Sequence, residues 1–164
     1  MTIKALTPKL VVSDAEHDDT ERGPGSTGND GGLVMTGQLT PYLCVDGAAA
    51  ALDWYQQALG ARLLGEPIVM DDGAIGHAEL SLGGARLYLA DPAPQIGAAP
   101  PAVLDPPGAA SVALHLEVAD CAAALDHARA AGAHITREPE QNPYGTGATF
   151  LDPFGHRWFL MAPA

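Results

Sequence analysis

The sequence predicts an α+β fold built from two copies of one unit, in which a strand and a helix are followed by three more strands (βαβββ). The first reason is an internal repeat, because residues 40–64 resemble residues 113–135. Four positions match at a constant offset, Leu43, Val45, Leu52 and Asp53 against Leu116, Val118, Leu125 and Asp126. The second reason is that each run is followed by three short strand-like stretches that turn signals separate. The 164 residues have room for both units in one domain, expected at residues 38–164.

The first unit, residues 38–91, begins with a strand and a helix. Residues 40–45 are a β-rich run in which alternate side chains share a face. Asp46 follows at the position from which a side chain can cap the next helix. An apolar stripe at helical spacing then runs up to Gly60, and glycine there favours the left-handed conformation that ends a helix.

Three strands complete the first unit, at residues 62–70, 75–82 and 86–90. Pro67 interrupts the first of them, and proline cannot donate a hydrogen bond to a sheet ladder. This strand is therefore expected at a sheet edge or to contain a bulge. The sequence Asp-Asp-Gly at 71–73 is a hairpin signal between the first two strands.

Residues 92–110 carry six prolines, set mostly among Ala and Gly, so they should connect the two units without forming a helix or a central strand. The second unit, residues 111–164, opens with a strand at 111–119. Asp120 should cap the helix that follows, and Gly132 should end it. A strand is then expected at residues 134–137 and a loop at 139–143. Two further strands are expected at residues 145–151 and 156–161.

Residues 1–37 precede both units and are expected to form a flexible acidic extension. Within it, residues 5–12 (ALTPKLVV) resemble residues 38–45 (QLTPYLCV), as if the first strand had been copied upstream. Residues 13–32 are acidic and rich in Gly, Ser, Thr and Asn, which is typical of a linker. The copy could lie along a sheet edge, compete with the first strand for its place, or remain part of a poorly ordered extension.

The charge and composition exclude several classes of partner. The net charge is −12, and both lysines lie in the N-terminal extension, so nucleic acid is not an expected partner. No uninterrupted apolar run approaches the length that spans a membrane. Two cysteines do not make a disulfide framework, and no apolar secretory signal opens the sequence, so a cytoplasmic location is expected. The acidic surface suits a cationic small molecule, or serves solubility alone.

Two sequence motifs carry a family resemblance. The run DGAIGHAEL at 72–80, the ending LDPFGHRWFLM at 151–161 and the two βαβββ units resemble the glyoxalase/bleomycin resistance/extradiol dioxygenase superfamily, also called vicinal oxygen chelate (VOC). The resemblance covers residues 39–162. It implies cupped mixed sheets that wrap around a cavity, helices on their outer faces, and a homodimer.

The metal enzymes of that family hold their metal on the first and last strands of each half. Carried onto this chain, those positions fall at Thr40, Tyr88, Ala113 and Phe159. A divalent metal site needs three or four converging His, Glu, Asp or Cys side chains, and none of these four is such a residue. We therefore expect no metal cofactor, with a divalent metal at a displaced site as the alternative.

Strand alternation directs other side chains toward the presumed cavity. His115 and Glu117 share a strand face with Ala113, while His77 and Glu79 share a face of their own strand. If these four side chains converged, they could bind a displaced metal, or His115 and Glu117 could act as general bases. They could equally be surface residues or part of a dimer interface. The predicted pocket comprises Tyr42, His77, Glu79, Tyr88, His115, Glu117, Arg157, Phe159 and Met161, with Trp54 as a further candidate.

Three functions are compatible with these patterns. The preferred one is a metal-free binder of a small molecule, cationic or aromatic, that resembles the antibiotic-sequestering members of the family. Glu79 and Glu117 would supply the negative charge that suits a cationic ligand. The alternative is a lyase, isomerase or dioxygenase-like enzyme with a non-standard metal or general-base site. The third is an interaction protein in which the N-terminal copy of the first strand adds to a sheet edge.

Overall fold

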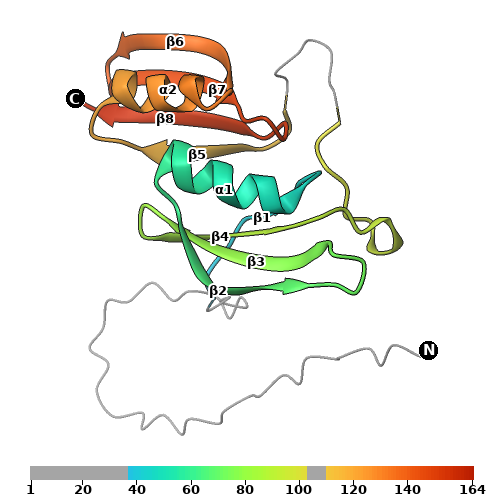
Figure 1. The fold of residues 1–164 in the computed structure, drawn as a ribbon. Helices are drawn as coiled ribbons and strands as arrows, with labels where there is room; N and C mark the ends of the chain where they lie inside the picture. Colours follow the sequence, from blue (N-terminus) through green and yellow to red (C-terminus); the bar gives the residue numbers. More distant parts are fainter. Residues whose placement is uncertain (1–36, 103–109) are drawn as a thin grey trace, which may run out of the picture. The chain divides into compact units, whose positions relative to one another are not determined.

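The computed structural model describes residues 37–102 and 110–164, and the N-terminal extension with its strand-like copy lies outside them. The predicted βαβββ order is confirmed in both units (Figure 1). The first unit contains β1 (Tyr42–Cys44), α1 (Ala48–Leu59), β2 (Arg62–Val69), β3 (Ile75–Leu82) and β4 (Ala85–Ala90). A short 3-10 helix, η1 (Pro94–Ile96), follows. The second unit contains β5 (Ala113–Glu117), α2 (Cys121–Ala130), β6 (His134–Asn142), β7 (Gly145–Leu151) and β8 (Arg157–Pro163).

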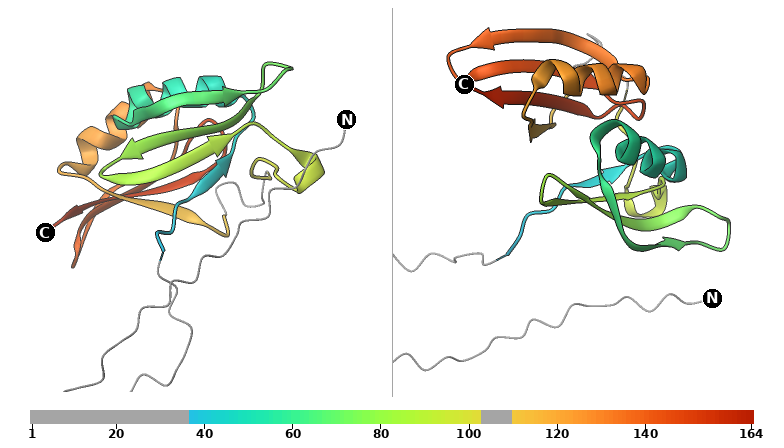
Figure 2. Two further views of the ribbon diagram at one scale, coloured as in Figure 1. Left: turned by 90° about the horizontal axis from the view of Figure 1, so that it is seen from below. Right: turned by 60° about the vertical axis from the view of Figure 1, so that its left-hand side comes forward.

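Each unit forms a four-stranded mixed sheet, which confirms the predicted α+β class. The strand orders are β1-β4-β3-β2 and β5-β8-β7-β6. In both sheets the first strand of the unit pairs in parallel with the last, and the other pairings are antiparallel. Each sheet is curved and carries a helix on one face, α1 on the first sheet and α2 on the second (Figure 2). No α-helix of the described residues lies on the opposite face of either sheet, and this face is called the open face below.

One hydrophobic core extends through both units, because α1 contacts α2 as well as the first sheet. Alternating strand residues that face the helices build it, including Val45, Leu80, Leu89, Phe150 and Leu160, all fully buried. Trp54 and Tyr55 of α1 are also buried in this core. No helix among the described residues is long and apolar enough to cross a membrane.

The position of Trp54 corrects the expectation that it lines the ligand pocket. Its indole Nε1 donates a hydrogen bond to the backbone oxygen of Ala131, at 2.7 Å. Its ring packs edge-on against Tyr55, with centroids 5.2 Å apart, and lies 6.3 Å from the ring of Phe150. Helical spacing predicts a helix face but not which neighbour covers it, and here the second unit does.

The start of α1 also differs from the prediction. Asp46 caps nothing, because Gly47 stands at the N-cap with φ 90° and without a side-chain hydrogen bond. The side chain that serves the helix is Asp91, at the end of β4, whose Oδ1 accepts from the backbone N–H groups of Gly47 and Ala48 at 3.1 and 2.8 Å. The predicted cap of α2 is confirmed, since Asp120 accepts from the N–H of Ala123 at 3.0 Å.

The prediction of a loop at residues 139–143 is wrong over most of its length, because the strand β6 continues to Asn142. Pro139 is tolerated for two reasons. β6 is an edge strand, so one of its sides needs no partner, and its pairing with β7 shifts register between Arg137 and Glu140. The analogous prediction for Pro67 is confirmed, since β2 is an edge strand whose register shifts between Leu64 and Ile68.

Candidate ligand-binding site

Three aromatic rings meet on the open face of the first sheet. Tyr42 on β1, His77 on β3 and Tyr88 on β4 alternate with residues that point into the core, which directs all three to the same face. The ring centroids of Tyr42 and His77 are 5.4 Å apart, those of Tyr42 and Tyr88 5.8 Å, and those of His77 and Tyr88 5.0 Å. All three pairs are edge-to-face, the favoured arrangement for isolated aromatic pairs. This group of residues is called the ring cluster.

A chain of polar contacts runs from the ring cluster along the open face. The hydroxyl of Tyr42 lies 2.9 Å from Nδ1 of His77, whose Nε2 is 3.5 Å from Oε1 of Glu79. The other oxygen of Glu79 accepts from Arg86 at 2.7 Å. The Glu79 side chain is 30% exposed and that of Arg86 50%, so solvent screens this ion pair.

The Tyr42 hydroxyl has one proton and two acceptors within reach, since it also lies 3.2 Å from the backbone oxygen of Gly76. With neutral His77 carrying its proton on Nε2, toward Glu79, the phenol donates to Nδ1. Burial, and then the neighbouring Cys44 thiol, raise the pKa of Tyr42, so the phenol stays protonated at neutral pH.

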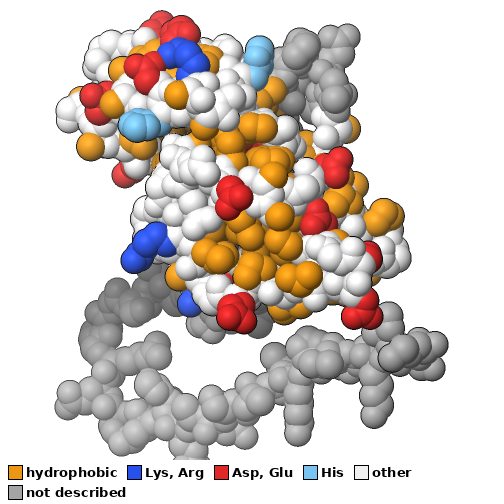
Figure 3. All heavy atoms as spheres, viewed as in Figure 1, with side chains coloured by type: hydrophobic (Ala, Val, Ile, Leu, Met, Phe, Trp, Pro, Cys, Tyr) orange, Lys and Arg blue, Asp and Glu red, His pale blue; other side chains and the backbone are white. Residues whose placement is uncertain are grey.

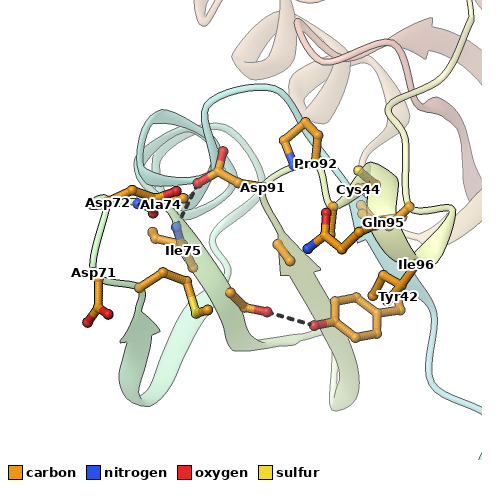
Figure 4. A pocket seen from close by; sticks show the side chains of 16 residues that line it. Tyr42, Cys44, Asp71, Asp72, Ala74, Ile75, Asp91, Pro92, Gln95 and Ile96 are labelled. Atoms are coloured by element: carbon orange, nitrogen blue, oxygen red, sulfur yellow. Dashed lines mark hydrogen bonds between the residues drawn. The ribbon is translucent and has the colours of Figure 1, made fainter. Parts of the chain in front are cut away.

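A cavity of about 610 Å³ adjoins the ring cluster (Figure 4). Tyr42 and Cys44 of β1 form one wall, the β2–β3 hairpin forms another, and the segment around η1 forms a third. That segment folds back on itself through a bridge between Ala93 and Ala98. The lining is mainly apolar, with Met70, Ile75, Pro92 and Ile96 among its members, and none of the described residues that form it is a Lys or an Arg.

The described residues that line this cavity include three carboxylates, and two of these accept hydrogen bonds from backbone N–H groups of the fold. Asp91 is fully engaged, because Oδ1 caps α1 and Oδ2 accepts from the N–H of Ile75 at 2.7 Å. Asp72 accepts from the N–H of Ala74 in the hairpin turn. Asp71 is exposed at the cavity rim and leaves its charge available to a ligand.

The other predicted pocket residues lie on the second sheet. His115 pairs with Phe159 and Glu117 with Met161 along the parallel β5–β8 ladder. The Arg157 guanidinium lies over the Phe159 ring, 5.2 Å from its centroid. His115 and Glu117 line a hollow of about 400 Å³ together with Arg86, and Arg157 lines another of about 520 Å³ together with Tyr42.

The structure thus divides the predicted residues into two sets. Tyr42, Tyr88, His77 and Glu79 come together on the first sheet, and the remaining five belong to the second. Sequence reasoning missed Arg86 and the cavity residues around η1. Arg86 could have been found, because it lies two residues before Tyr88 on β4 and therefore faces the same side of the sheet. The proline-rich composition around η1 indicated only a connection between the units and gave no sign that this segment lines a cavity.

The strand register shows which residues lie beside two of the four positions carried over from the metal enzymes. Tyr88 is paired with Tyr42, and Phe159 is paired with His115. Only His115 of these four paired residues is a typical ligand of a divalent metal. Within residues 37–102 and 110–164, no group of three or more His, Cys, Asp or Glu side chains could hold a metal ion. The described residues at these paired positions therefore do not supply the donor set of such a metal site.

Proteins with similar sequences occur in mycobacteria. Uncharacterized proteins from Mycobacterium tuberculosis and Mycobacterium bovis are each 36% identical to this chain over 126 residues, or 76% of it. The match covers 74% of the M. tuberculosis protein and 82% of the M. bovis protein.

Solved structures share the fold. TnmS3 from Streptomyces sp. CB03234, an antibiotic binding protein, has 23% identity and a TM-score of 0.56, covering 81% of this chain and 100% of its own. A glyoxalase I mutant from Zea mays has 21% identity and a TM-score of 0.59, covering 77% of this chain and 44% of its own. The family model for the Glyoxalase/Bleomycin resistance protein/Dioxygenase superfamily matches residues 33–160. The chain belongs to this superfamily, as the two βαβββ units and their register indicate.

Proposed function

We propose that this protein binds a small aromatic or cationic organic molecule, without metal chemistry, at the ring cluster and in the cavity beside it. The observation that carries the proposal is the position of Tyr42, which belongs to both. Its ring contacts His77 and Tyr88, and it also lines the cavity of about 610 Å³. A cavity of this volume with an apolar lining and few polar groups is typical of small-molecule sites.

The charge around the cavity supports a cationic ligand. Glu79 is shared between His77 and Arg86, so most of its charge is compensated. Asp71 at the rim and the net charge of −12 supply the remaining negative potential, and acidic side chains lie among hydrophobic ones over the first unit in Figure 3. Aromatic rings attract cations through their faces, and the ring cluster adds this contribution.

We further propose that the protein acts as a cytoplasmic homodimer. Large apolar side chains are exposed in and after the edge strand β2, where Ile68, Val69 and Met70 are 57%, 63% and 53% exposed. An exposed edge strand with such side chains is a surface that a second copy can cover. In a dimer, the open face of one copy could complete the pocket of the other. Two free cysteines fit a reducing compartment.

The test is calorimetric titration in the presence of EDTA with two probes that combine aromatic rings and positive charge, metal-free bleomycin and acriflavine. We expect saturable binding of at least one probe, and Tyr42→Ala should weaken it about 10-fold through the loss of one aromatic contact. The matched control is Tyr144→Ala, since Tyr144 is 81% exposed and lines none of the cavities described above. Absence of binding by both probes, or equal losses in the two variants, contradicts the proposal.

A second candidate function is an enzyme, and the contacts from Tyr42 through His77 to Glu79 favour it, because a hydrogen-bonded histidine beside a carboxylate can act as a general base. His115 and Glu117 are the alternative catalytic pair, since a partner chain could bring them near the ring cluster. Titration with Zn²⁺, Ni²⁺, Mn²⁺ and Fe²⁺ separates the two functions. Stoichiometric metal binding that disappears in the His77→Ala, His115→Ala variant would make the enzyme the better explanation, and no binding at micromolar metal supports the metal-free site.

A further inference from the structure

We propose that Met70 forms a movable wall of the cavity beside the ring cluster, that Gly76 provides the space for it, and that the site therefore accepts planar aromatic molecules of different widths. Both residues line this cavity. The inference rests on the proposed function and deepens it, because it assigns the shape of the ligand and the two residues that select it.

Gly76 lacks a side chain where Met70 fills the space. A Cβ atom added to Gly76 would lie 2.7 Å from the sulfur of Met70 and 3.2 Å from its Cγ. Atoms that are not bonded to each other do not approach so closely, so any side chain at residue 76 would displace that of Met70. The φ of Gly76 lies outside the left-handed region. Space, and not backbone conformation, therefore limits this position.

A β-bulge gives Gly76 its special place in β3. One step along β2, from Ile68 to Val69, spans two steps along β3, from His77 to Ile75, and Gly76 is the extra residue. Bulges often occur beside functional sites, and glycine in a strand often marks a place where a ligand approaches the backbone closely. Gly76 thus offers a bare stretch of backbone as the floor of the cavity.

The backbone of Met70 is fixed, whereas its side chain can move. Its N–H donates to the backbone oxygen of Ala74 at 2.8 Å, and its own backbone oxygen accepts from the N–H of Gly73 at 2.9 Å. The residue is 53% exposed, so solvent borders about half of it. A methionine side chain is unbranched, rotates about three bonds and makes favourable contacts between its sulfur and aromatic rings. The thioether can therefore change position while the hairpin keeps its shape.

The opposite wall of the cavity is held in place. Tyr42 stands across the cavity from Asp71 of the hairpin (Figure 4). The rings of His77 and Tyr88 pack edge-on against Tyr42, and its hydroxyl lies 3.2 Å from the backbone oxygen of Gly76. A planar ligand would pack against this fixed aromatic wall, and its far edge would meet the thioether. Flexible methionines are a common means by which one site binds several ligands.

NMR of protein labelled with ¹³C in its methionine methyl groups tests the wall without any ligand. The Met70→Leu variant identifies the Met70 signal by its loss. Gly76→Ala should shift this signal, because the added methyl group displaces the thioether. The displaced group is the end of a flexible side chain, so we expect the variant to stay folded and its Met161 signal to stay in place.

The matched control is Gly147→Ala in the second unit. A Cβ atom at Gly147 would lie 3.4 Å from the methyl carbon of Met161, which is close to an ordinary contact. This variant should leave the Met70 signal where it is. A Met70 signal that does not move in Gly76→Ala, or that moves as far in Gly147→Ala, would overturn the proposal.

Binding of two cations of different width tests the selection of ligands. Gly76→Ala should weaken the binding of acriflavine, which has three fused rings, about 10-fold, because overpacking a filled site carries a penalty of this order. N-methylquinolinium, with two fused rings, should lose less, because it can stay against Tyr42. Adding Met70→Ala to Gly76→Ala should restore most of the acriflavine affinity. Equal losses for the two cations, or no recovery in the double variant, would overturn the proposal.

The inference and the proposed function fail in different ways. Absence of binding by both metal-free bleomycin and acriflavine contradicts the proposed function, and the Met70 signal in Gly76→Ala still decides whether the two residues form the wall. Acriflavine binding that leaves the Met70 signal of the unmodified protein in place would overturn the wall and retain a binding site.

Discussion

The two βαβββ units begin their helices in different ways. α2 is capped by Asp120, the residue directly before it, and this local signal is visible in the sequence. α1 is served by Asp91, which lies 43 residues beyond Ala48 and reaches the helix only after β4 has paired with β1. The first helix therefore depends on its sheet for its N-terminus, whereas the second helix carries its own cap.

The units also differ in where they bury polar groups. In the second unit, Asp152 is 4% exposed and accepts four hydrogen bonds. Its donors are the Tyr55 hydroxyl at 2.6 Å, Trp158 Nε1 at 2.9 Å, and the backbone N–H groups of Phe154 and His156 at 3.0 and 2.9 Å. Tyr55 belongs to α1, so this carboxylate joins the two units. The second unit thus provides the anchor, and the first unit provides the larger cavity and the ring cluster.

The largest predicted effect comes from removing the anchor. Asp152→Ala leaves the buried hydroxyl of Tyr55 and the indole N–H of Trp158 without their acceptor, and we expect it to lower the free energy of unfolding by about 3–5 kcal/mol. Urea unfolding followed by tryptophan fluorescence measures this change. Asp46→Ala is the matched control, because Asp46 is exposed and does not cap α1, and its effect should stay within about 0.5 kcal/mol. Similar losses in both variants would contradict the anchor.

The two helix caps should differ in the same measurement. Asp91→Ala removes the acceptor of three backbone N–H groups, those of Gly47 at the N-cap of α1, Ala48 in its first turn and Ile75, and should cost about 2 kcal/mol. Asp120→Ala removes the acceptor of one and should cost about 1 kcal/mol. If Asp120→Ala proved the more damaging change, the long-range cap would not have the importance given to it here.

A smaller effect should appear at alkaline pH. Burial, and then the charge of Asp152 and its hydrogen bond, raise the pKa of Tyr55 far above its ordinary value near 10. Above about pH 10 the unfolded chain releases this proton while the folded chain keeps it. Stability that is fully present below pH 10 is therefore lost as the pH rises, by about 1.4 kcal/mol per pH unit.

Tyr55→Phe should remove this contribution. Unfolding free energies measured between pH 10 and 11 should fall less steeply in Tyr55→Phe than in the unmodified protein. Tyr144→Phe, which changes an exposed tyrosine, should keep the full slope. Identical slopes in all three proteins would show that Tyr55 titrates normally and is not held by Asp152.

Local patterns predicted most of the fold because the features concerned are local. The repeat gave the element order, Gly60 ended α1 with φ 67°, and alternation placed Tyr42 and Tyr88 on one face. The errors involve partners that are distant in sequence. Whether Trp54 meets Ala131, and whether Asp91 rather than Asp46 serves α1, depends on contacts that no short window contains. The sequence did not predict that the segment around η1 lines the cavity. Its proline content indicates that regular structure is lacking but does not indicate where the segment lies in the fold.

Hydrogen exchange with and without a bound probe tests the central claim most directly, because it locates the ligand in one unit or the other. We expect the tighter of metal-free bleomycin and acriflavine to increase protection at residues 41–45, 70–77 and 90–98, which surround the ring cluster and its cavity. Residues 113–117 and 157–161 should gain less protection than these segments of the first unit. Protection confined to these two segments of the second unit, or no protection anywhere, would contradict a ligand site built on the first sheet.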